Sequence, residues 1–515
     1  MSNTLEPGDA LQHGRDYKVV HVDDARALIF LTGNHRILEV DAATGGRLER
    51  GLDNLTPEEA REWSLLRERG ALEDVNRNVL MSSSYEDGSN LALNVNLTGS
   101  CNLDCTYCFA DGGDYGRITD KMGSHTVDYI FDFIRGHVTR SRIVRFEFFG
   151  GEPLLNFARI QQICERSDEF SAETGIQFIH RISTNLTVLP KGAPELMRDR
   201  HFIVSVSIDG GAETHDRNRP TKAGGGSFDK ILANCWKVRE VGGDTVTMVA
   251  RMTVVSSQPP LIDNVKELWG LNLFDYFQIY PGVTSGGSCN GGEGLVQLGT
   301  KNTTKQTMNI DFLSQLEVLL AEYPNLFQPG NRFKGGLEYE RLMQMVLEGK
   351  MALGFCGAGK TYYTISPDDS IMACHRMVGE VEYQIGTGPE GVTRDTSEWT
   401  LPVDQHPVCS NCWARYVCGG NCRQENFVAT GKLRALNEET CNYQLSLLAG
   451  VLRLIGRTDP SFRSRDRHRL DDLFVSCGRP VVPNSRRERE AALDGLRFFR
   501  PLPAALDAGA QNLLG

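Results

Sequence analysis

Features that define several large protein classes are missing from this sequence. No apolar run approaches the roughly 20 residues that a membrane-spanning helix needs, and the N-terminus lacks the basic start and apolar stretch of a secretory signal. Positive charge is in deficit, with 55 basic against 66 acidic residues and a net charge of −11, which argues against a general nucleic-acid-binding protein. We therefore expect a cytoplasmic protein with neither a membrane nor nucleic acid as a partner.

The 515 residues exceed one ordinary domain, and the sequence pattern changes three times along the chain. We expect a small N-terminal α+β domain over residues 1–82 and a strand–helix region over 90–300. A cysteine-rich domain is expected at 345–450. The arginine-rich residues 460–515 are expected to form a partly helical extension.

The region from 90 to 300 alternates β-rich runs with helix-like segments, which predicts a parallel sheet. Six repeats suggest an α/β fold of the partial barrel type, (β/α)6, whose active site lies at the carboxyl ends of the strands. The predicted strands cover residues 91–97, 143–149, 177–183, 202–208, 246–254 and 275–280.

Cysteine is abundant, with 14 residues, and ten of them fall in two groups. Disulfides are rare in a reducing cytoplasm, where clustered cysteines more often bind metal or do chemistry. The other four are scattered and are expected to be small buried hydrophobes or idle surface thiols. They are Cys164, Cys235, Cys289 and Cys477.

The first group, Cys101, Cys105 and Cys108, has the spacing Cys-x3-Cys-x2-Cys directly after the first predicted strand. Three thiolates on one loop can hold a 4Fe–4S cube, which usually takes four, so one iron stays open for another ligand. The alternative is a zinc site, but zinc prefers four protein ligands and a fourth is not evident nearby.

The segments after the next strands strengthen one interpretation of this group. The strings FFGGEP, STN and SIDG follow the second, third and fourth strands. With the three cysteines they resemble the radical S-adenosylmethionine (SAM) enzymes. The resemblance implies that an electron from the cluster cleaves SAM to a 5′-deoxyadenosyl radical. It also assigns SAM contacts to Tyr107, Gly150, Gly151, Glu152, Ser183, Thr184, Asn185, Ser207, Asp209 and Arg251.

The second cysteine group has the spacing Cys-x2-Cys-x5-Cys-x3-Cys, with one cysteine after it and two before it. A zinc ribbon would explain the first pair, but the whole set resembles the SPASM extension with two auxiliary iron–sulfur clusters. The resemblance implies two ligand sets. The first is Cys409, Cys412, Cys418 and Cys441, and the second is Cys356, Cys374 and Cys422.

The second set has only three cysteines. Sulfatase-maturing relatives carry a further cysteine where this chain reads GAGKT at residues 357–361. An open iron can bind a substrate thiolate, although another residue or a water can equally fill the position.

The strings CFADGGDYG, EFFGGEPLLNF and CHRMVGE resemble peptide maturases that join a cysteine sulfur to carbon, such as those of six-cysteine peptides and of a quinohemoprotein amine dehydrogenase subunit. The resemblance implies a precursor peptide or small protein as substrate and a flavodoxin or ferredoxin as electron donor. Alternatives are carbon–carbon cross-linking, formylglycine-type oxidation, or a non-catalytic iron–sulfur sensor or binding protein.

Candidates for the base that takes the thiol proton are Asp368, Asp369 and His375, which lie near cluster ligands in sequence. The two aspartates have an alternative role as turn formers. His215 and Arg219 either face the active site or have structural roles.

The N-terminal region has strand-like runs and then a helix whose Thr56 and Glu59 form a predicted capping box. It resembles the winged-helix recognition unit of peptide-modifying enzymes, which binds a leader peptide as an added edge strand. A purely structural α+β unit is the alternative.

Overall fold

The computed structural model describes residues 11–72, 90–116, 120–137, 143–255, 259–281, 312–463, 481–482 and 496–502. Cys289, Cys477 and most of the predicted extension 460–515 lie outside these residues. Within them, no helix is both long and apolar enough to cross a membrane.

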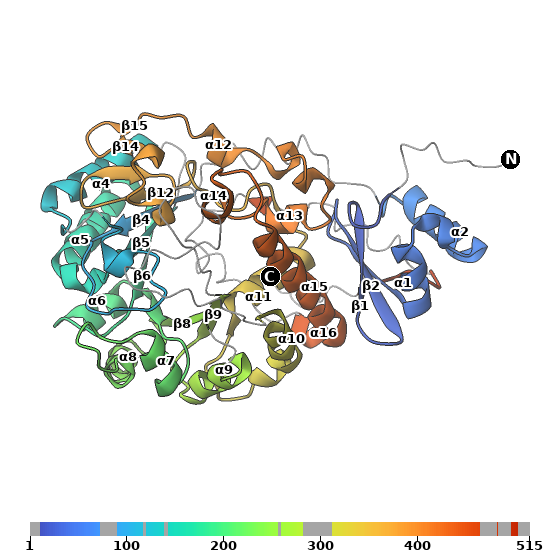
Figure 1. Ribbon diagram of the computed structural model, residues 1–515, viewed down its shortest axis with the longest axis horizontal. Helices are drawn as coiled ribbons and strands as arrows, with labels where there is room; N and C mark the ends of the chain where they lie inside the picture. Colours follow the sequence, from blue (N-terminus) through green and yellow to red (C-terminus); the bar gives the residue numbers. More distant parts are fainter. Residues whose placement is uncertain are drawn as a thin grey trace, which may run out of the picture.

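Six parallel strands form the centre of the molecule, each hydrogen-bonded to the next in chain order (Figure 1). They are β4 (Asn90–Asn96), β5 (Ile143–Phe149), β6 (Gln177–Thr184), β7 (Ile203–Ser207), β8 (Thr247–Val254) and β9 (Tyr276–Pro281). Their outer side carries α4 (Ser124–His137), α5 (Phe157–Thr174), α6 (Ala193–Asp199), α8 (Phe228–Gly242) and α9 (Leu261–Gly270). The predicted α/β open barrel is confirmed.

Alternation along β4 shows why the sheet has two different faces. Leu91, Leu93 and Val95 belong to the main apolar core, whereas Asn94 and Asn96 lie between them and are fully buried. Successive side chains of a strand point to opposite faces. The inner face of the sheet is therefore polar, although it is almost closed to solvent.

The cysteine-rich region continues the barrel sheet instead of forming a separate layer, a relationship that the sequence did not predict. β12 (Tyr362–Ile365) runs parallel to β4 at the open edge of the sheet. β13 (Ser370–Met372), β14 (Gln384–Thr387) and β15 (Gly391–Val392) then follow antiparallel. This pairing brings the segment after β13, which includes Cys374, beside the carboxyl ends of the barrel strands.

Short elements complete the polypeptide between the barrel and the C-terminal helices. They are α7 (Ala212–Asn218), α10 (Phe312–Glu322), β10 (Gly335–Gly336), α11 (Leu337–Leu347), β11 (Met351–Ala352), α12 (Ser397–Thr400), α13 (Arg415–Cys418), α14 (Arg423–Thr430), α15 (Glu438–Arg457), α16 (Pro460–Arg463) and β16 (Val481–Val482).

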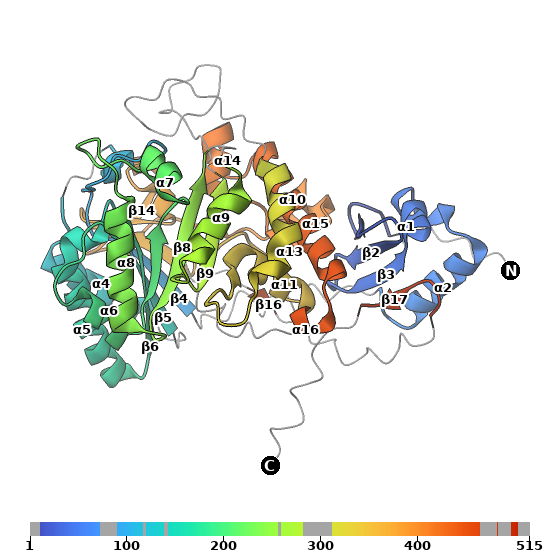
Figure 2. The ribbon, with the colours of Figure 1, turned by 90° about the horizontal axis from the view of Figure 1, so that it is seen from below.

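The N-terminal residues form their own small sheet at one end of the molecule (Figure 2). Its strands are β1 (Tyr17–His21), β2 (Arg26–Leu31) and β3 (Ile37–Asp41), followed by α1 (Ala42–Glu49) and α2 (Pro57–Glu68). The predicted capping box of α2 is present, with Glu59 N donating to Thr56 Oγ1 (3.3 Å) and Thr56 N to Glu59 (2.8 Å). A distant segment, β17 (Arg500–Pro501), completes this sheet beside β3.

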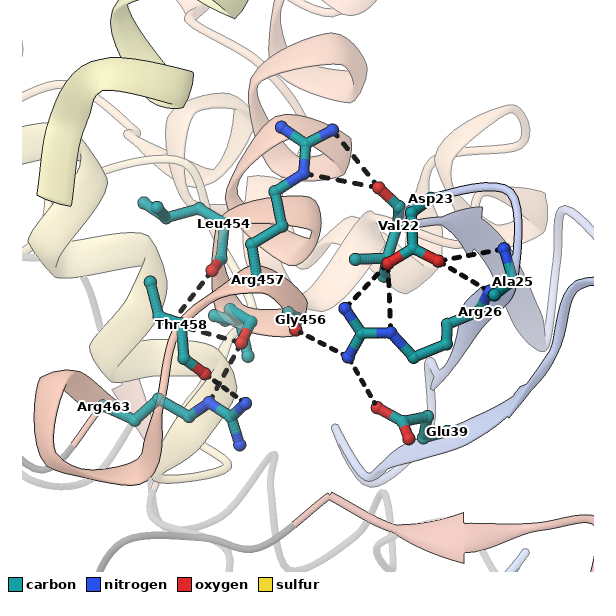
Figure 3. Close-up of polar contacts among 11 residues, drawn as sticks. Val22, Asp23, Ala25, Arg26, Glu39, Leu454, Gly456, Arg457, Thr458 and Arg463 are labelled. Carbon is teal, nitrogen blue, oxygen red and sulfur yellow. Dashed lines mark hydrogen bonds and ion pairs between the residues drawn. The ribbon is translucent and has the colours of Figure 1, made fainter.

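The end of α15 fixes the N-terminal sheet to the rest of the chain (Figure 3). Arg26 donates from Nη1 to the carbonyl of Gly456 (3.4 Å), and Arg457 donates to the carbonyl of Val22 (3.2 Å). Asp23 holds the Arg26 side chain at 2.7 Å. One helix thus connects the N-terminal sheet to the cysteine-rich region, because Cys441 lies in the first turn of α15.

Candidate active site

The first cysteine group lies in the loop after β4, at the carboxyl end of the sheet. The backbone amides of Asp104 and Thr106 donate to the carbonyls of Pro220 (2.9 Å) and Asn218 (3.0 Å), which holds the loop against the end of α7. Cys101, Cys105 and Cys108 are free, half-buried thiols. The structure therefore brings together the three predicted ligands.

The electrostatics of these thiols fit an iron–sulfur cluster. Burial raises the pKa of Cys101 to about 11 and that of Cys105 to about 12, and each group lies close enough to the other cysteines to raise these values further. Three such thiols stay protonated alone at neutral pH, whereas iron binding deprotonates cysteine outright. Among the described residues, no three ligands converge on one single ion.

Gly150 and Gly151 pack directly against the loop that carries the first cysteine. A Cβ on Gly150 would lie 2.5 Å from Asn96 Oδ1 and from the carbonyl oxygen of Thr98, and one on Gly151 only 2.2 Å from the carbonyl oxygen of Ser100. Gly150 also has a φ of 127°, a conformation that only glycine adopts readily. These glycines therefore set the position of the cysteine loop, in addition to the predicted approach to SAM.

Glu152 is fully buried, and protein donors hold its carboxylate. Oε1 accepts from Thr184 Oγ1 (2.6 Å) and Leu154 N (3.0 Å), while Oε2 accepts from Asn185 N (2.7 Å). Burial raises its pKa to about 7, against the opposing effect of these hydrogen bonds. Glu152 and Thr184 thus join the ends of β5 and β6, which places the predicted SAM segments next to each other.

Asn185 orients the first cluster ligand. Its side-chain amide donates to Asn102 Oδ1 (3.0 Å) and approaches Cys101 Sγ at 3.7 Å. Its Oδ1 is held by Thr187, whose N and Oγ1 donate at 2.9 and 2.6 Å. Donors to cluster sulfurs tune a cluster's reduction potential, so this predicted SAM contact also has a role beside the thiolate.

A polar group on the inner face of the sheet includes Glu147, a residue that the sequence reasoning missed. Glu147 Oε1 accepts from Ser183 Oγ (2.9 Å), to which Arg251 Nη1 also donates (3.3 Å). Burial opposes ionisation of Glu147, yet the charges of Arg181 and Arg251 lower its pKa. The predicted residues Ser183 and Arg251 are therefore adjacent, and the half-buried Ser207 lies opposite Arg251 in the β7–β8 pairing.

Asp209 lies at the centre of a second polar group. Arg219 donates to both its oxygens at 3.0 Å, Tyr107 Oη donates to Oδ2, and Thr253 N donates to Oδ1 (2.9 Å). The guanidinium also covers the Tyr107 ring, 5.1 Å from its centroid, and reaches Cys105 Sγ at 4.0 Å. Because four protein donors occupy the carboxylate, Asp209 positions Tyr107 and Arg219, a role different from the predicted ribose contact.

The predicted set of four auxiliary cysteines is brought together. Burial raises the pKa of Cys409 to about 12, and the neighbouring Cys418, Cys412 and Cys441 raise it further. Asn421 approaches Cys441 Sγ at 3.8 Å, as Asn185 does Cys101. The donor set fits a cluster with four protein ligands.

The set of three auxiliary cysteines lies nearer the barrel. Burial raises the pKa of Cys422 well above its usual value, and the nearby Cys374 adds to the effect. Cys356 follows a segment against which Gly419 packs so closely that a Cβ there would lie 2.3 Å from the carbonyl oxygen of Gly354. This contact holds the Cys356 segment to the turn that leads to Cys422.

Phe109 connects the first cysteine group to this second set. It follows Cys108, and its ring lies edge-on to His375 at 6.3 Å and under Arg376 at 5.8 Å. Arg376 Nη1 in turn donates to Glu425 Oε1 of α14 (2.7 Å). The loop of the first cysteine group therefore contacts the residues that directly follow Cys374.

The two predicted aspartate bases are turn residues. Asp368 is exposed and accepts from Ser370 Oγ (2.7 Å), while Asp369 has a φ of 61° and accepts from Thr126 Oγ1 of α4 (2.7 Å). Their carboxylates close the β12–β13 connection and hold it to α4. The structure thus favours the turn-former alternative over general-base chemistry.

The two histidines differ in their surroundings. His375 Nδ1 bonds to Tyr362 Oη (2.7 Å), and its ring lies 5.2 Å from that of Phe149, at the end of β5. Burial lowers its pKa to about 4. His215 is fully buried and bonds to Ser227 Oγ (2.9 Å), which gives it a structural role.

The site and the fold define a class of protein. Residues 95–258, which span β4 to β8 with all the predicted SAM contacts, match the family model of the Radical SAM superfamily. The chain is therefore a radical SAM enzyme, and its cofactors are S-adenosylmethionine and 4Fe–4S iron–sulfur clusters.

Individual relatives narrow the comparison. The cysteine-type anaerobic sulfatase-maturating enzyme of Clostridium perfringens (strain ATCC 13124) is 24% identical over 355 residues, covering 64% of this chain and 87% of that enzyme. An uncharacterized protein of Methanocaldococcus jannaschii is 31% identical over 128 residues, and this match spans only 41% of its length. The solved structure of anSMEcpe with bound AdoMet shares the fold, with a TM-score of 0.60, 20% identity, and coverage of 74% of this chain and 97% of that one.

Proposed function

We propose that this enzyme is a peptide maturase that forms a thioether between a cysteine sulfur and a carbon of the same peptide. The observation that carries the proposal is the contact of Phe109 with the segment after Cys374. A substrate thiol beside the three-cysteine set would lie next to the radical-generating loop. Anaerobic sulfatase-maturating enzymes among the relatives support a protein or peptide substrate.

The chain's residues divide the work between two neighbouring centres. Cys101, Cys105 and Cys108 would hold the cluster to which SAM binds, and when bound these groups supply a radical that removes one hydrogen atom from a peptide carbon. Forming the carbon–sulfur bond also releases the thiol proton and one further electron. His375, which faces the contact between the two centres, is the proposed acceptor of the proton, and the auxiliary clusters are the proposed acceptors of the electron.

The proposed auxiliary ligands follow the two cysteine sets. Cys409, Cys412, Cys418 and Cys441 would saturate one cluster, whereas Cys356, Cys374 and Cys422 would leave one iron position open. Residues 357–361, where the sulfatase-maturing branch has its extra cysteine, form a tight turn into β12 in which three amides donate to the carbonyl of Gly357. No thiol is present in that turn.

The experiment is mass spectrometry of candidate peptides after reaction with the anaerobically reconstituted, reduced enzyme. The probes are short cysteine-containing peptides encoded beside the gene and a sulfatase-type cysteine peptide. A loss of two hydrogens, with a thiol that no longer reacts with iodoacetamide, supports a thioether. Thiols that stay free after turnover contradict it.

Side-chain oxidation is the second candidate, and it is favoured by the sulfatase-maturating relatives. The same spectra separate it from the first. Formylglycine formation from cysteine replaces the thiol by an aldehyde and removes sulfur, whereas a thioether keeps the sulfur in the peptide. An aldehyde that reacts with a hydrazine probe would identify this second activity.

A further inference from the structure

The outer edge of the N-terminal sheet holds a segment from the other end of the chain. β17 pairs antiparallel with β3, so that Arg500 lies opposite Glu39 and Pro501 opposite Leu38. The next amide, Leu502 N, donates to the carbonyl of Ile37 at 3.1 Å. The segment therefore extends the sheet as a short fourth strand.

The other side of this segment contacts α2. The amides of Arg497 and Phe498 donate to the two carboxylate oxygens of Glu62 at 2.9 and 2.8 Å, between residues about 435 positions apart. Phe499 is fully buried, with its ring edge-on to Trp63 at 5.3 Å. Residues 496–502 thus lie between β3 and α2, held through their backbone and one aromatic anchor.

This mode of contact is that of a bound peptide. Backbone pairing along a sheet edge gives affinity for extended segments of many sequences, and a pocket for one side chain gives selectivity. The interface is small, because one buried ring and a few backbone hydrogen bonds must offset the ordering of seven residues. Such a segment can exchange with another of the same pattern.

The charges state which pattern fits. The face carries Glu39, Glu58 and Glu62, and the occupant presents Arg497 near Glu58 (3.9 Å) and Arg500 opposite Glu39. An extended segment with a basic residue two positions before the buried aromatic side chain therefore matches the site. The string LRFFRPL at residues 496–502 has this composition.

We propose that the β3–α2 face is a docking site for an extended, basic and aromatic peptide segment, and that residues 496–502 are its internal occupant. An incoming peptide must displace them, so the C-terminal segment acts as a built-in competitor. The proposal rests on the proposed peptide-maturase function only for what the incoming peptide is.

The site is held in a fixed relation to the auxiliary cysteines. The helix that begins beside Cys441 ends with Arg457 on the carbonyl of Val22 in the N-terminal sheet. Trp413, which directly follows Cys412, also donates from its backbone to the carbonyl of Gly14 (2.9 Å). A peptide docked on β3 would therefore start from a defined position relative to the chemistry.

The test measures binding without SAM, reductant or turnover. The probe is a fluorescein-labelled synthetic peptide with the sequence of residues 495–503, and fluorescence anisotropy compares the full chain with a chain ending at Asp494. We expect the shortened chain to bind at least about tenfold more tightly. In that chain, Glu62→Lys should abolish binding, whereas Glu68→Lys, at the exposed end of α2, should not. A peptide in which the second phenylalanine is serine should not bind.

A second variant protects the test against misfolding of the shortened chain. In the full chain, Phe499→Ser should free the site and allow the probe to bind while the melting temperature stays within a few degrees. Equal binding to full and shortened chains overturns the proposal, as does no binding to either freed chain. If both variants aggregate or melt far lower, the segment is a permanent part of the core and the proposal fails. Loss of thioether chemistry leaves all these readouts unchanged.

Discussion

Arg219 and Asp209 form a two-pronged ion pair, with Nε and Nη2 each 3.0 Å from a carboxylate oxygen, and both side chains are buried. The pair lies between the Tyr107 ring and the sulfur of Cys105. It joins the strand end of β7 to the cysteine loop, so its geometry controls both the predicted adenine contact and one cluster ligand.

Asp209→Asn should break this pair and leave a buried, uncompensated guanidinium. Removing one partner of a buried pair costs about 3–5 kcal/mol, so the melting temperature should fall together with the rate of 5′-deoxyadenosine formation. Glu213→Gln on the exposed face of α7 is the matched control. A higher KM for SAM at unchanged thermal stability would instead show that Asp209 binds the ribose, as the sequence alone indicated.

Gly151→Ala should damage cluster binding before it affects the sheet. Its Cβ would lie 2.2 Å from the carbonyl of Ser100 and 2.9 Å from Cys101 N, so the cysteine loop must shift. We expect iron and sulfide content per chain to fall after reconstitution, with a far-ultraviolet circular dichroism spectrum like that of the parent. Gly136→Ala on α4, where the added carbon meets nothing within 4 Å, should load normally; equal loading of both variants would contradict this account.

Asn185→Asp should lower the reduction potential of the first cluster. The change keeps Oδ1 as the acceptor for Thr187 but removes the amide donor beside Cys101. One hydrogen bond of about 1 kcal/mol corresponds to roughly 40 mV for a one-electron couple, and the added charge acts in the same direction. A redox titration followed by electron paramagnetic resonance measures the shift. Asn234→Asp, whose side chain bonds to the carbonyl of Leu186 instead, should leave the potential unchanged.

The N-terminal sheet should lose stability in acid. Burial opposes ionisation of Glu59, but donors from Arg47, Thr44 and Thr56 outweigh it and lower the pKa from 4.5 to about 2. The unfolded chain therefore binds the proton more readily, and this stabilisation is complete above pH 4.5 and is lost as the pH falls toward 2. Hydrogen exchange of residues 17–41 across this pH range checks it. Glu59→Gln should flatten the dependence, and Glu68→Gln should not.

Much of the barrel was predictable because its strands alternate in a simple way. The runs around Leu93, Phe146 and Val204 are apolar and β-rich, and the SAM segments follow them at a regular spacing. The polar inner face was present in the same strands as single charged or amide residues. Glu147 within IVRFEFF is a signal that the sequence reasoning did not use.

The remaining features depend on contacts that short segments make far along the chain. β13 has three residues and β17 has two, too few for any periodicity to appear. The cysteine-rich region consequently seemed separate from the barrel, although β12 pairs with β4. Asp209 seemed free to bind ribose, because nothing local indicates that Arg219 and Tyr107 converge on it.

The contact between the two cysteine groups gives the last prediction. Arg376 lies over Phe109 and is held by Glu425 at 2.7 Å, so Glu425→Gln should release the guanidinium from the radical-generating loop. Cleavage of SAM depends on the first cluster and should change by less than about twofold, whereas cross-linked peptide should fall at least about tenfold, because a misplacement of about 1 Å costs roughly that much or more. Liquid chromatography of 5′-deoxyadenosine and mass spectrometry of the peptide give both quantities from one reaction. Glu382→Gln, an exposed residue of the same region, should keep the two coupled; an equal fall of both products in Glu425→Gln would place the defect in the first cluster and contradict a role at the contact.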